Sequence, residues 1–296
     1  MNVSSVRRFG VVGAGQMGRG IAQVAAAAGF DVILSDVSLA FAEGGKDKIA
    51  QALGKQVDKG KMKPEDRAQL LDRIEARQGL AEFSRVDVAV EAVTESLDLK
   101  AGIFKEADAA LPKDAILASN TSSISITRLA AATARPDRVI GMHFMNPVPL
   151  MKLVEIVRGL QTSDATFDVV RDLSIKLGKT VIVSKDRPGF IVNRILIPFL
   201  NEACFALEEA LGSPEDIDAG ARLGLNHPMG PLELADLIGL DTLLFIAEVL
   251  HREIGDSKYR PATLLRNLVA AGWLGKKTGR GFYVYDAQGN KAGRSA

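Results

Sequence analysis

The chain has 296 residues, of which 47% are hydrophobic and 25% are charged, a composition that excludes an intrinsically disordered protein and allows one large domain or two ordinary ones. The formal net charge of +1 gives no reason to expect nucleic-acid binding, and the apolar runs are too short or interrupted for us to expect a membrane span or a signal peptide. Cys204 is the only cysteine, which excludes an intramolecular disulfide and favours a cytoplasmic setting.

The first half of the chain alternates short apolar runs with helix-period segments, a pattern typical of βαβ units. The expected strands are residues 9–12, 31–35, 86–93, 115–118, 139–142, 152–157 and 180–183. The expected helices are residues 16–28, 97–110 and 166–177, with a charged helical insertion at about 38–80 that breaks near residues 60–64. This order predicts a Rossmann-type, doubly wound and mostly parallel sheet.

The pattern changes at residues 185–189, where Pro188 and Gly189 mark a break. Beyond this point almost every segment has helical periodicity, notably residues 193–211 and 232–254. The first of these is apolar around most of its circumference, so we expect it to be buried in a core or between subunits. We therefore predict an NAD-binding α/β domain over residues 1–187 and an all-α C-terminal domain over residues 188–296 for substrate binding and dimerisation.

A glycine motif, GAGQMG, lies between the first predicted strand and the first predicted helix. Glycine at the first position permits a tight turn, at the second a close approach of the backbone to a pyrophosphate, and at the third close packing of helix on strand. The N-terminus of the helix would then face the phosphates. The loop residues assigned to a dinucleotide are Gly13, Gly15, Gln16, Met17 and Gly18.

Asp36 ends the second predicted strand, about 20 residues after the glycines. A carboxylate at this place would accept hydrogen bonds from the adenosine ribose and repel a 2′-phosphate. The alternative is a surface aspartate that ends a strand. Together with the glycine motif, Asp36 favours NAD over NADP as the cofactor.

Three histidines occur, of which His251 is expected at the surface and His227 in a structural turn. His143 follows the apolar run 139–142, and we expect it at a strand end, where open α/β sheets bind their ligands. A lone histidine at a strand end could equally be structural. Removal of hydride from an alcohol needs a base for the hydroxyl proton, and histidine suits this role because it ionises near neutral pH.

A carboxylate that orients the histidine is the next expectation, and Glu155 is the candidate. It lies in the otherwise apolar strand KLVEIV, where an unpaired acid would be costly to bury. Asn193 is a polar residue after the apolar run FIV, and Ser122 lies in a polar segment after a strand. These side chains could converge between the domains. The scattered histidines and the absence of a Cys/His cluster predict no metal site.

Six stretches carry a family resemblance. They are GAGQMGRGIA at 13–22, ASNTSSISI at 118–126, GMHFMNPVPLMKLVEIV at 141–157, DRPGFIVNR at 186–194, GPLELADLIGLD at 230–241 and GKKTGRGFYVYD at 275–286. In this order, and over nearly the whole chain, they resemble the L-3-hydroxyacyl-CoA dehydrogenases, most closely the single-function bacterial enzymes that act on 3-hydroxybutyryl-CoA. The resemblance implies NAD-dependent oxidation of the 3-hydroxyl of a short (S)-3-hydroxyacyl-CoA.

The resemblance also implies residue roles. His143 would be the general base and Glu155 would orient it, while Ser122 would bind the reacting oxygen and Asn193 the substrate. The positions near the cofactor would be Glu91, Glu95, Lys100 and Asn120. The C-terminal domain would carry much of a homodimer interface.

The acyl-CoA contact is expected in the helical insertion, where the resemblance places Lys55 and Lys59 near the phosphates of CoA. Some relatives have a serine where this chain has Ala52. The alternative for both lysines is a solvated helical face. Two other functions stay open: a dehydrogenase of the same fold that acts on a free hydroxy acid, such as the gulonate or carnitine enzymes, and a non-enzymatic protein that has kept the fold.

Overall fold

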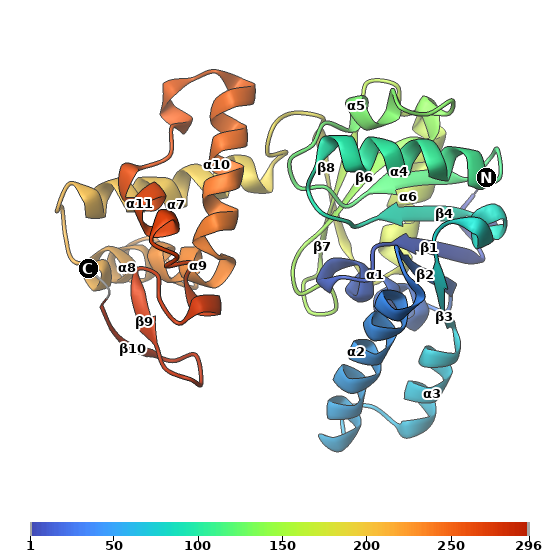
Figure 1. Ribbon diagram of the computed structural model, residues 1–296, viewed down its shortest axis with the longest axis horizontal. Helices are drawn as coiled ribbons and strands as arrows, with labels where there is room; N and C mark the ends of the chain where they lie inside the picture. The colour runs from blue at the N-terminus through green and yellow to red at the C-terminus, as the bar shows by residue number, and fades with distance from the viewer. Residues whose placement is uncertain (1, 295–296) are drawn as a thin grey trace. The chain divides into compact units, whose positions relative to one another are not determined.

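The computed structural model describes residues 2–294, and its contacts divide the chain into residues 1–187 and residues 188–296, here called unit 1 and unit 2 (Figure 1). Unit 1 contains an eight-stranded sheet in the order β3-β2-β1-β4-β5-β6-β7-β8. All neighbouring strands in it are parallel except β6 and β7. This confirms the predicted doubly wound, mostly parallel sheet. The strands are β1 (Arg8–Val12), β2 (Asp31–Asp36), β3 (Ile74–Gln78), β4 (Val88–Glu91), β5 (Ile116–Ser119), β6 (Val139–Phe144), β7 (Leu153–Arg158) and β8 (Thr180–Lys185).

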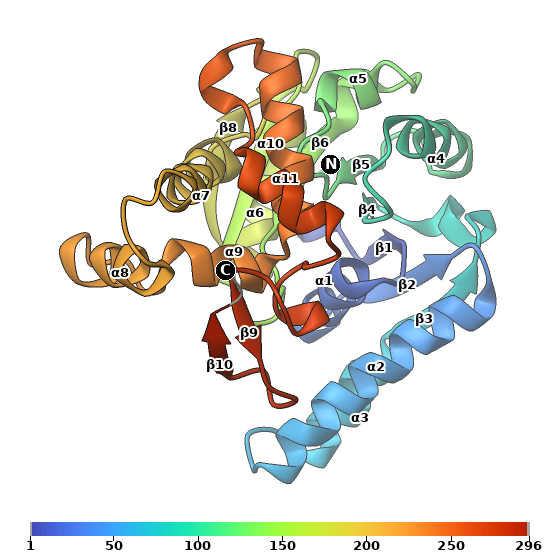
Figure 2. The same cartoon turned by 60° about the vertical axis from the view of Figure 1, so that its left-hand side comes forward.

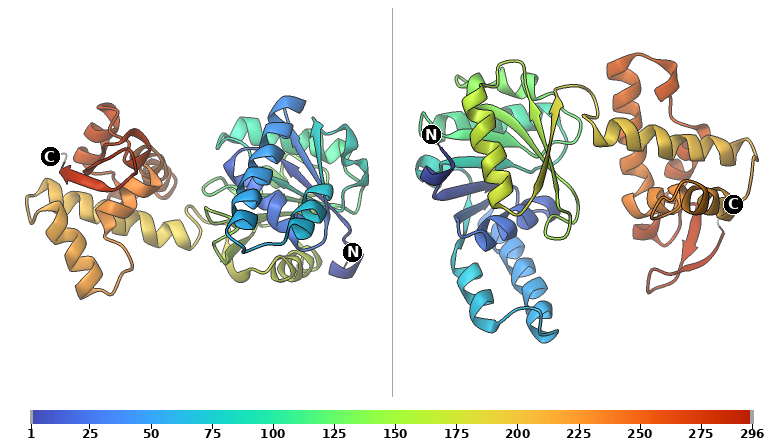
Figure 3. Two further views of the ribbon diagram at one scale, coloured as in Figure 1. Left: turned by 90° about the horizontal axis from the view of Figure 1, so that it is seen from below. Right: turned by 180° about the vertical axis from the view of Figure 1, so that it is seen from behind.

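Helices cover both faces of this sheet. They are α1 (Gln16–Ala27), α2 (Leu39–Asp58), α3 (Pro64–Asp72), α4 (Leu97–Ala110), α5 (Ile126–Ala130) and α6 (Asp164–Lys176). The view from behind in Figure 3 shows α6 in front of the sheet, whereas α4 lies in front of it in Figure 1. Strands covered on both faces favour apolar side chains, and every residue of β4 and β6 is buried, including the polar Glu91 and His143.

The helical insertion follows β2 and forms two helices, α2 and α3, which extend from the sheet as a pair (Figure 2). The break near residues 60–64 was predicted, but the strand β3 at the end of the insertion was not. In β3 only Ile74 is buried, and Glu75 and Arg77 form an ion pair at 2.8 Å. An edge strand exposes much of its surface and can carry charged residues. The charged sequence of β3 therefore could not be told apart from the charged helical segment before it.

Unit 2 is mainly helical, as predicted. It contains α7 (Val192–Glu208), α8 (Pro214–Ala219), α9 (Pro231–Ile238), α10 (Leu240–Ile254) and α11 (Thr263–Ala270). The predicted helical region over residues 232–254 forms two helices, because Gly239 has φ +103° and separates α9 from α10. A hairpin of β9 (Tyr283–Tyr285) and β10 (Lys291–Arg294) was also missed, so unit 2 is not entirely helical.

Two buried aspartates hold the hairpin to the helices of unit 2. Asp236 accepts hydrogen bonds from the backbone N–H groups of Phe282 and Tyr283 and from the Tyr285 hydroxyl. Asp218 accepts one from the Tyr283 hydroxyl at 2.7 Å. The polar residues of this region therefore have structural partners.

No helix among residues 2–294 combines the length and apolar character needed to cross a membrane.

Candidate active site

His143 and Glu155 lie directly opposite each other in the antiparallel pair β6 and β7. His143 Nδ1 is 3.0 Å from Glu155 Oε2, Glu155 is fully buried and His143 is 7% exposed. A carboxylate only accepts hydrogen bonds, so the tautomer that bonds to Glu155 carries its proton on Nδ1 and has its lone pair on Nε2. His143 lies within β6, whereas the sequence had placed it after the strand. The pair is suited to taking up a proton at Nε2 and stabilising the resulting imidazolium.

Ser122 lies in the loop of residues 120–124, which follows β5 in unit 1. Asn120 begins this loop, and its side-chain Oδ1 accepts a hydrogen bond from the backbone N–H of Phe144 at 2.9 Å. Phe144 is the residue after His143. The loop that carries Ser122 is therefore tied to the strand that carries His143.

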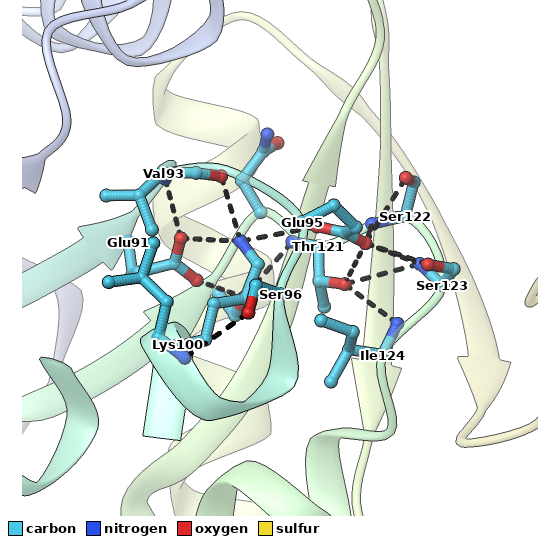
Figure 4. A network of polar contacts seen from close by, with 12 residues as sticks. Glu91, Val93, Glu95, Ser96, Lys100, Thr121, Ser122, Ser123 and Ile124 are labelled. Carbon is cyan, nitrogen blue, oxygen red and sulfur yellow. Dashed lines mark hydrogen bonds and ion pairs between the residues drawn. The ribbon is translucent and has the colours of Figure 1, made fainter. Parts of the chain in front are cut away.

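A polar network lies beside the same loop and contacts it (Figure 4). Glu95 Oε1 accepts hydrogen bonds from the Thr121 hydroxyl and from the backbone N–H groups of Ser122 and Ser123. Burial opposes ionisation of Glu95, but the charge of Lys100 and these hydrogen bonds outweigh it and hold the pKa of the carboxyl below its ordinary value. Glu95 is therefore a fixed anion beside the loop. Three of the expected cofactor-side residues, Glu91, Glu95 and Lys100, belong to this one network.

The glycine loop has the geometry of a dinucleotide cradle. Gly13 has φ +100°, and a Cβ on it would lie 2.7 Å from the Ala92 carbonyl oxygen. A Cβ on Gly18 would lie 1.7 Å from the Gly13 carbonyl oxygen, so both positions require glycine. Gly15 differs, because nothing lies within 4 Å of its Cβ position. It caps α1 without a side chain, which leaves room for a phosphate at the helix N-terminus.

Asp36 ends β2 and lines a cavity of about 300 Å³ together with Gly15, Arg19 and Phe41. Its two carboxylate oxygens accept hydrogen bonds from the backbone N–H groups of Ala14 and Val37, each at 2.7 Å. These bonds fix the carboxylate at the rim of the glycine loop. The residues present thus fit the adenosine half of NAD.

Asn146 is a residue of this region that the sequence interpretation missed. Its side-chain Oδ1 accepts a hydrogen bond from Gln16 Nε2 at 3.0 Å, so it links the segment after β6 to the first residue of α1. The signal available in the sequence was an asparagine three residues after His143, next to Pro147, on the ligand side of the strand.

The remaining predicted residues belong to other elements. Lys55 and Lys59 are exposed at the end of α2, and Asn193 is buried in the first turn of α7, in unit 2. The convergence of Asn193 with His143 stays a prediction. His251 is exposed, as expected. His227 Nδ1 is 2.6 Å from the Met229 carbonyl oxygen, which agrees with a structural role.

Cys204 is fully buried in α7, and burial raises the pKa of its thiol far above the ordinary value. This agrees with an inert thiol. Among residues 2–294, no group of three or more His, Cys, Asp or Glu side chains could hold a metal ion.

Comparison with protein families gives two matches. Residues 8–187 match the model described as 3-hydroxyacyl-CoA dehydrogenase, NAD binding domain. Residues 189–285 match the model described as 3-hydroxyacyl-CoA dehydrogenase, C-terminal domain. Together the two models cover nearly all of both units.

Individual proteins are similar over almost the whole chain. The 3-hydroxybutyryl-CoA dehydrogenase of Bradyrhizobium diazoefficiens is 55% identical over 280 residues, which are 95% of this chain and 96% of that protein. A probable 3-hydroxybutyryl-CoA dehydrogenase of Bacillus subtilis is 52% identical over 281 residues, which are 95% and 98% of the two chains. The crystal structure of (S)-3-hydroxybutyryl-CoA dehydrogenase from Ralstonia eutropha has 54% identity and a TM-score of 0.92, and covers 95% of this chain and 100% of that one.

Proposed function

The chain belongs to the 3-hydroxyacyl-CoA dehydrogenase family, and on this premise we propose how its residues perform the reaction. It is an NAD-dependent oxidoreductase that interconverts the 3-hydroxyl of a short (S)-3-hydroxyacyl-CoA and the 3-ketone, as the names of its relatives indicate for 3-hydroxybutyryl-CoA. The 3-ketone of that substrate is acetoacetyl-CoA. The family, enzyme class and cofactor predicted from the sequence are confirmed.

The buried pair of His143 and Glu155 is the observation that carries the proposed mechanism. Oxidation of an alcohol releases a proton from the hydroxyl and a hydride from its carbon. His143 Nε2 takes the hydroxyl proton, while Glu155 holds Nδ1–H and stabilises the positive ring. In the reverse direction the imidazolium returns the proton to the ketone oxygen. NAD, when bound, supplies the hydride acceptor.

Two further residues complete the proposed substrate contacts. The Ser122 hydroxyl hydrogen-bonds the reacting oxygen, and the fixed loop around it supports this role because the backbone N–H of Ser122 is held by Glu95 at 3.0 Å. Asn193 holds the substrate near the pair of His143 and Glu155. Asn193 is buried at the start of α7, where solvent contact does not account for a polar side chain, and this supports a functional role.

The two ends of the cofactor would contact different strands of the sheet. Gly13, Gly15, Gln16, Met17 and Gly18 would receive the pyrophosphate, and Asp36 would accept hydrogen bonds from the adenosine ribose. Glu95, Lys100 and Asn120 follow β4 and β5 and would lie on the nicotinamide side, together with the buried Glu91 at the end of β4. The open space at Gly15 supports this assignment.

Lys55 and Lys59 would meet the phosphates of CoA, because both are exposed cations near one end of α2. We further propose a homodimer that forms through unit 2 in the cytoplasm. The large exposed side chains of Ile195, Leu211 and Leu223, with exposed fractions of 68%, 80% and 86%, support an interface there. Light scattering of the purified chain measures its mass and tests the dimer.

The test of the reaction is oxidation of NADH by the purified chain with acetoacetyl-CoA, beside free acetoacetate and with NADPH as the control cofactor. Rapid turnover only with the thioester and NADH is the expected result. Binding of NADH without turnover of the thioester would contradict the proposed substrate and point to a free hydroxy acid.

A further inference from the structure

Lys100 is an almost fully buried cation in the first turn of α4. It is 1% exposed, and its Nζ lies 2.6 Å from Oε1 of Glu91, which is 0% exposed. The Val93 carbonyl oxygen accepts a further hydrogen bond from Nζ at 3.2 Å. A charged pair this deep in the sheet is rare unless every polar atom is satisfied.

The cation also reaches Glu95. Lys100 Nζ is 3.3 Å from Glu95 Oε2, on the side of the carboxylate away from the loop. The other oxygen, Oε1, accepts the Ser122 backbone N–H at 3.0 Å and has the Ser122 hydroxyl oxygen at 3.5 Å. Figure 4 shows this chain of contacts from Glu91 through Lys100 and Glu95 to the loop of residues 120–124.

A second route joins Glu91 to the same loop. Glu91 Oε2 accepts a hydrogen bond from the Ser119 hydroxyl at 2.7 Å, and Ser119 Oγ accepts one from the Thr121 backbone N–H at 3.1 Å. The two routes fix the loop at Thr121 and at Ser122. They meet in the Glu91 carboxylate.

Buried ion pairs contribute little to stability compared with apolar side chains of similar size, because desolvation offsets their attraction. Stability alone therefore gives a weak account of the Glu91–Lys100 pair. Its polar contacts give a stronger one: Glu91 accepts from the Ser119 hydroxyl and Lys100 pairs with Glu95, and both of these partners hydrogen-bond the loop that carries Ser122.

We propose that Lys100, neutralised by Glu91, is a positioning residue that holds Ser122 in place through Glu95. This inference rests on the proposed role of Ser122 at the reacting oxygen. Lys100 acts through Glu95, whose carboxylate it keeps ionised and aimed at the loop. Glu91 makes the buried cation tolerable and fixes where its ammonium group points.

The test compares the double variant Glu91→Gln/Lys100→Met with Lys100→Met alone. The double variant removes both members of the Glu91–Lys100 pair, and Glu95 keeps its hydrogen bonds from the loop, so the thermal unfolding midpoint should stay within about 4 °C of the wild type. Lys100→Met leaves Glu91 without its cation and should unfold at a lower temperature. In both variants kcat, measured at saturating NADH and acetoacetyl-CoA, should fall about tenfold or more.

Hydrogen exchange gives a readout that needs no turnover. The Ser122 and Ser123 amides donate to Glu95, so they should exchange about tenfold faster in both variants. Lys105→Met, at an exposed position of the same helix, is the matched control and should change neither readout. An inactive wild type would refute the proposed function and leave the exchange test intact.

Three outcomes would overturn the inference. The double variant could recover kcat along with stability, which would make the pair purely structural. The two amides could keep their protection while kcat falls, which would mean that Lys100 acts by another route. Protection could also be lost with kcat unchanged, in which case the position of the loop would not matter to the reaction.

Discussion

The side chain of Asn120 accepts a hydrogen bond from the backbone N–H of Phe144 at 2.9 Å, and this bond joins the two segments that carry the proposed reacting groups. Ser122 lies two residues after Asn120, and His143 immediately precedes Phe144. His143 and Ser122 are both proposed to contact the reacting oxygen of the substrate. The distance between them must therefore be held closely, because small misplacements of reacting groups strongly lower the rate. One amide oxygen thus contributes to the spacing of the site.

Asn120→Ala removes this acceptor and leaves the Phe144 N–H without its partner. We expect kcat with acetoacetyl-CoA to fall about tenfold or more. Asn120→Asp keeps an acceptor oxygen in the same place and should lose less. Steady-state kinetics of both variants provide the measurement, and equal losses in the two would show that the hydrogen bond is not what matters.

His143→Gln tests the proposed general base. Glutamine cannot take up the proton at neutral pH, so kcat should fall at least about 10²-fold. The affinity for NADH, measured by fluorescence titration, should change little, because His143 acts on the substrate oxygen. His251→Gln, at an exposed position, is the control. A variant of His143 with near-normal kcat would rule it out as the base.

Most strands of the sheet and most of the candidate site residues could be predicted from the sequence, because both depend on local signals. Apolar runs of strand length, the GAGQMG motif and the acid within KLVEIV are visible without a structure. The contact between His143 and Glu155 is different, because it depends on the antiparallel register of β6 and β7, which no local pattern states. Their association was inferred from chemistry and from resemblance.

What the sequence missed depends on contacts distant along the chain or on single backbone angles. The hydrogen bond between Gln16 and Asn146 joins residues 130 positions apart. The network of Glu91, Lys100 and Ser119 consists of common polar residues, and the sequence does not show that they are buried together. Gly239 ends a helix only because its φ is positive, and the flanking apolar pattern continues across it.

Asp36→Ala tests whether Asp36 recognises the adenosine ribose of the cofactor. The change removes an acceptor and the repulsion of a 2′-phosphate, so the preference for NADH over NADPH in kcat/KM should narrow at least about tenfold. Asp36 also holds the Ala14 N–H, so activity with both cofactors should fall. Asp36→Asn keeps an acceptor oxygen and should narrow the preference with a smaller overall loss. An unchanged ratio in both variants would assign the ribose to another residue.

Lys55→Ala and Lys59→Ala test the contact with CoA. Each change should raise the KM for acetoacetyl-CoA about fivefold, since both cations are exposed and an exposed charge pair contributes at most about 1 kcal/mol. The KM for NADH should stay the same. Lys61→Ala and Lys63→Ala, in the turn after α2, are matched controls. If all four variants behave alike, the lysines at 55 and 59 belong to a solvated face.

Glu95 makes acid stability a test of its charge. Its pKa in the folded chain lies below the ordinary 4.5, so the folded state binds its proton less readily than the unfolded state does. The ionised carboxylate therefore stabilises the fold fully above pH 4.5, and this contribution is lost as pH falls through the lowered pKa. Burial opposes this effect, but the charge of Lys100 and the hydrogen bonds from the loop outweigh it.

Glu95→Gln cannot ionise and lacks this dependence. The difference between the urea midpoints of wild type and variant should be greatest above pH 4.5 and should shrink as the solution becomes more acidic. Glu106→Gln, at an exposed position of α4, should show little difference at any pH. A Glu95→Gln difference that does not vary with pH would mean that the side chain acts by its shape and hydrogen bonds alone. In that case the attraction between the Lys100 ammonium and a charged Glu95 carboxylate would not be what holds Glu95 at the loop.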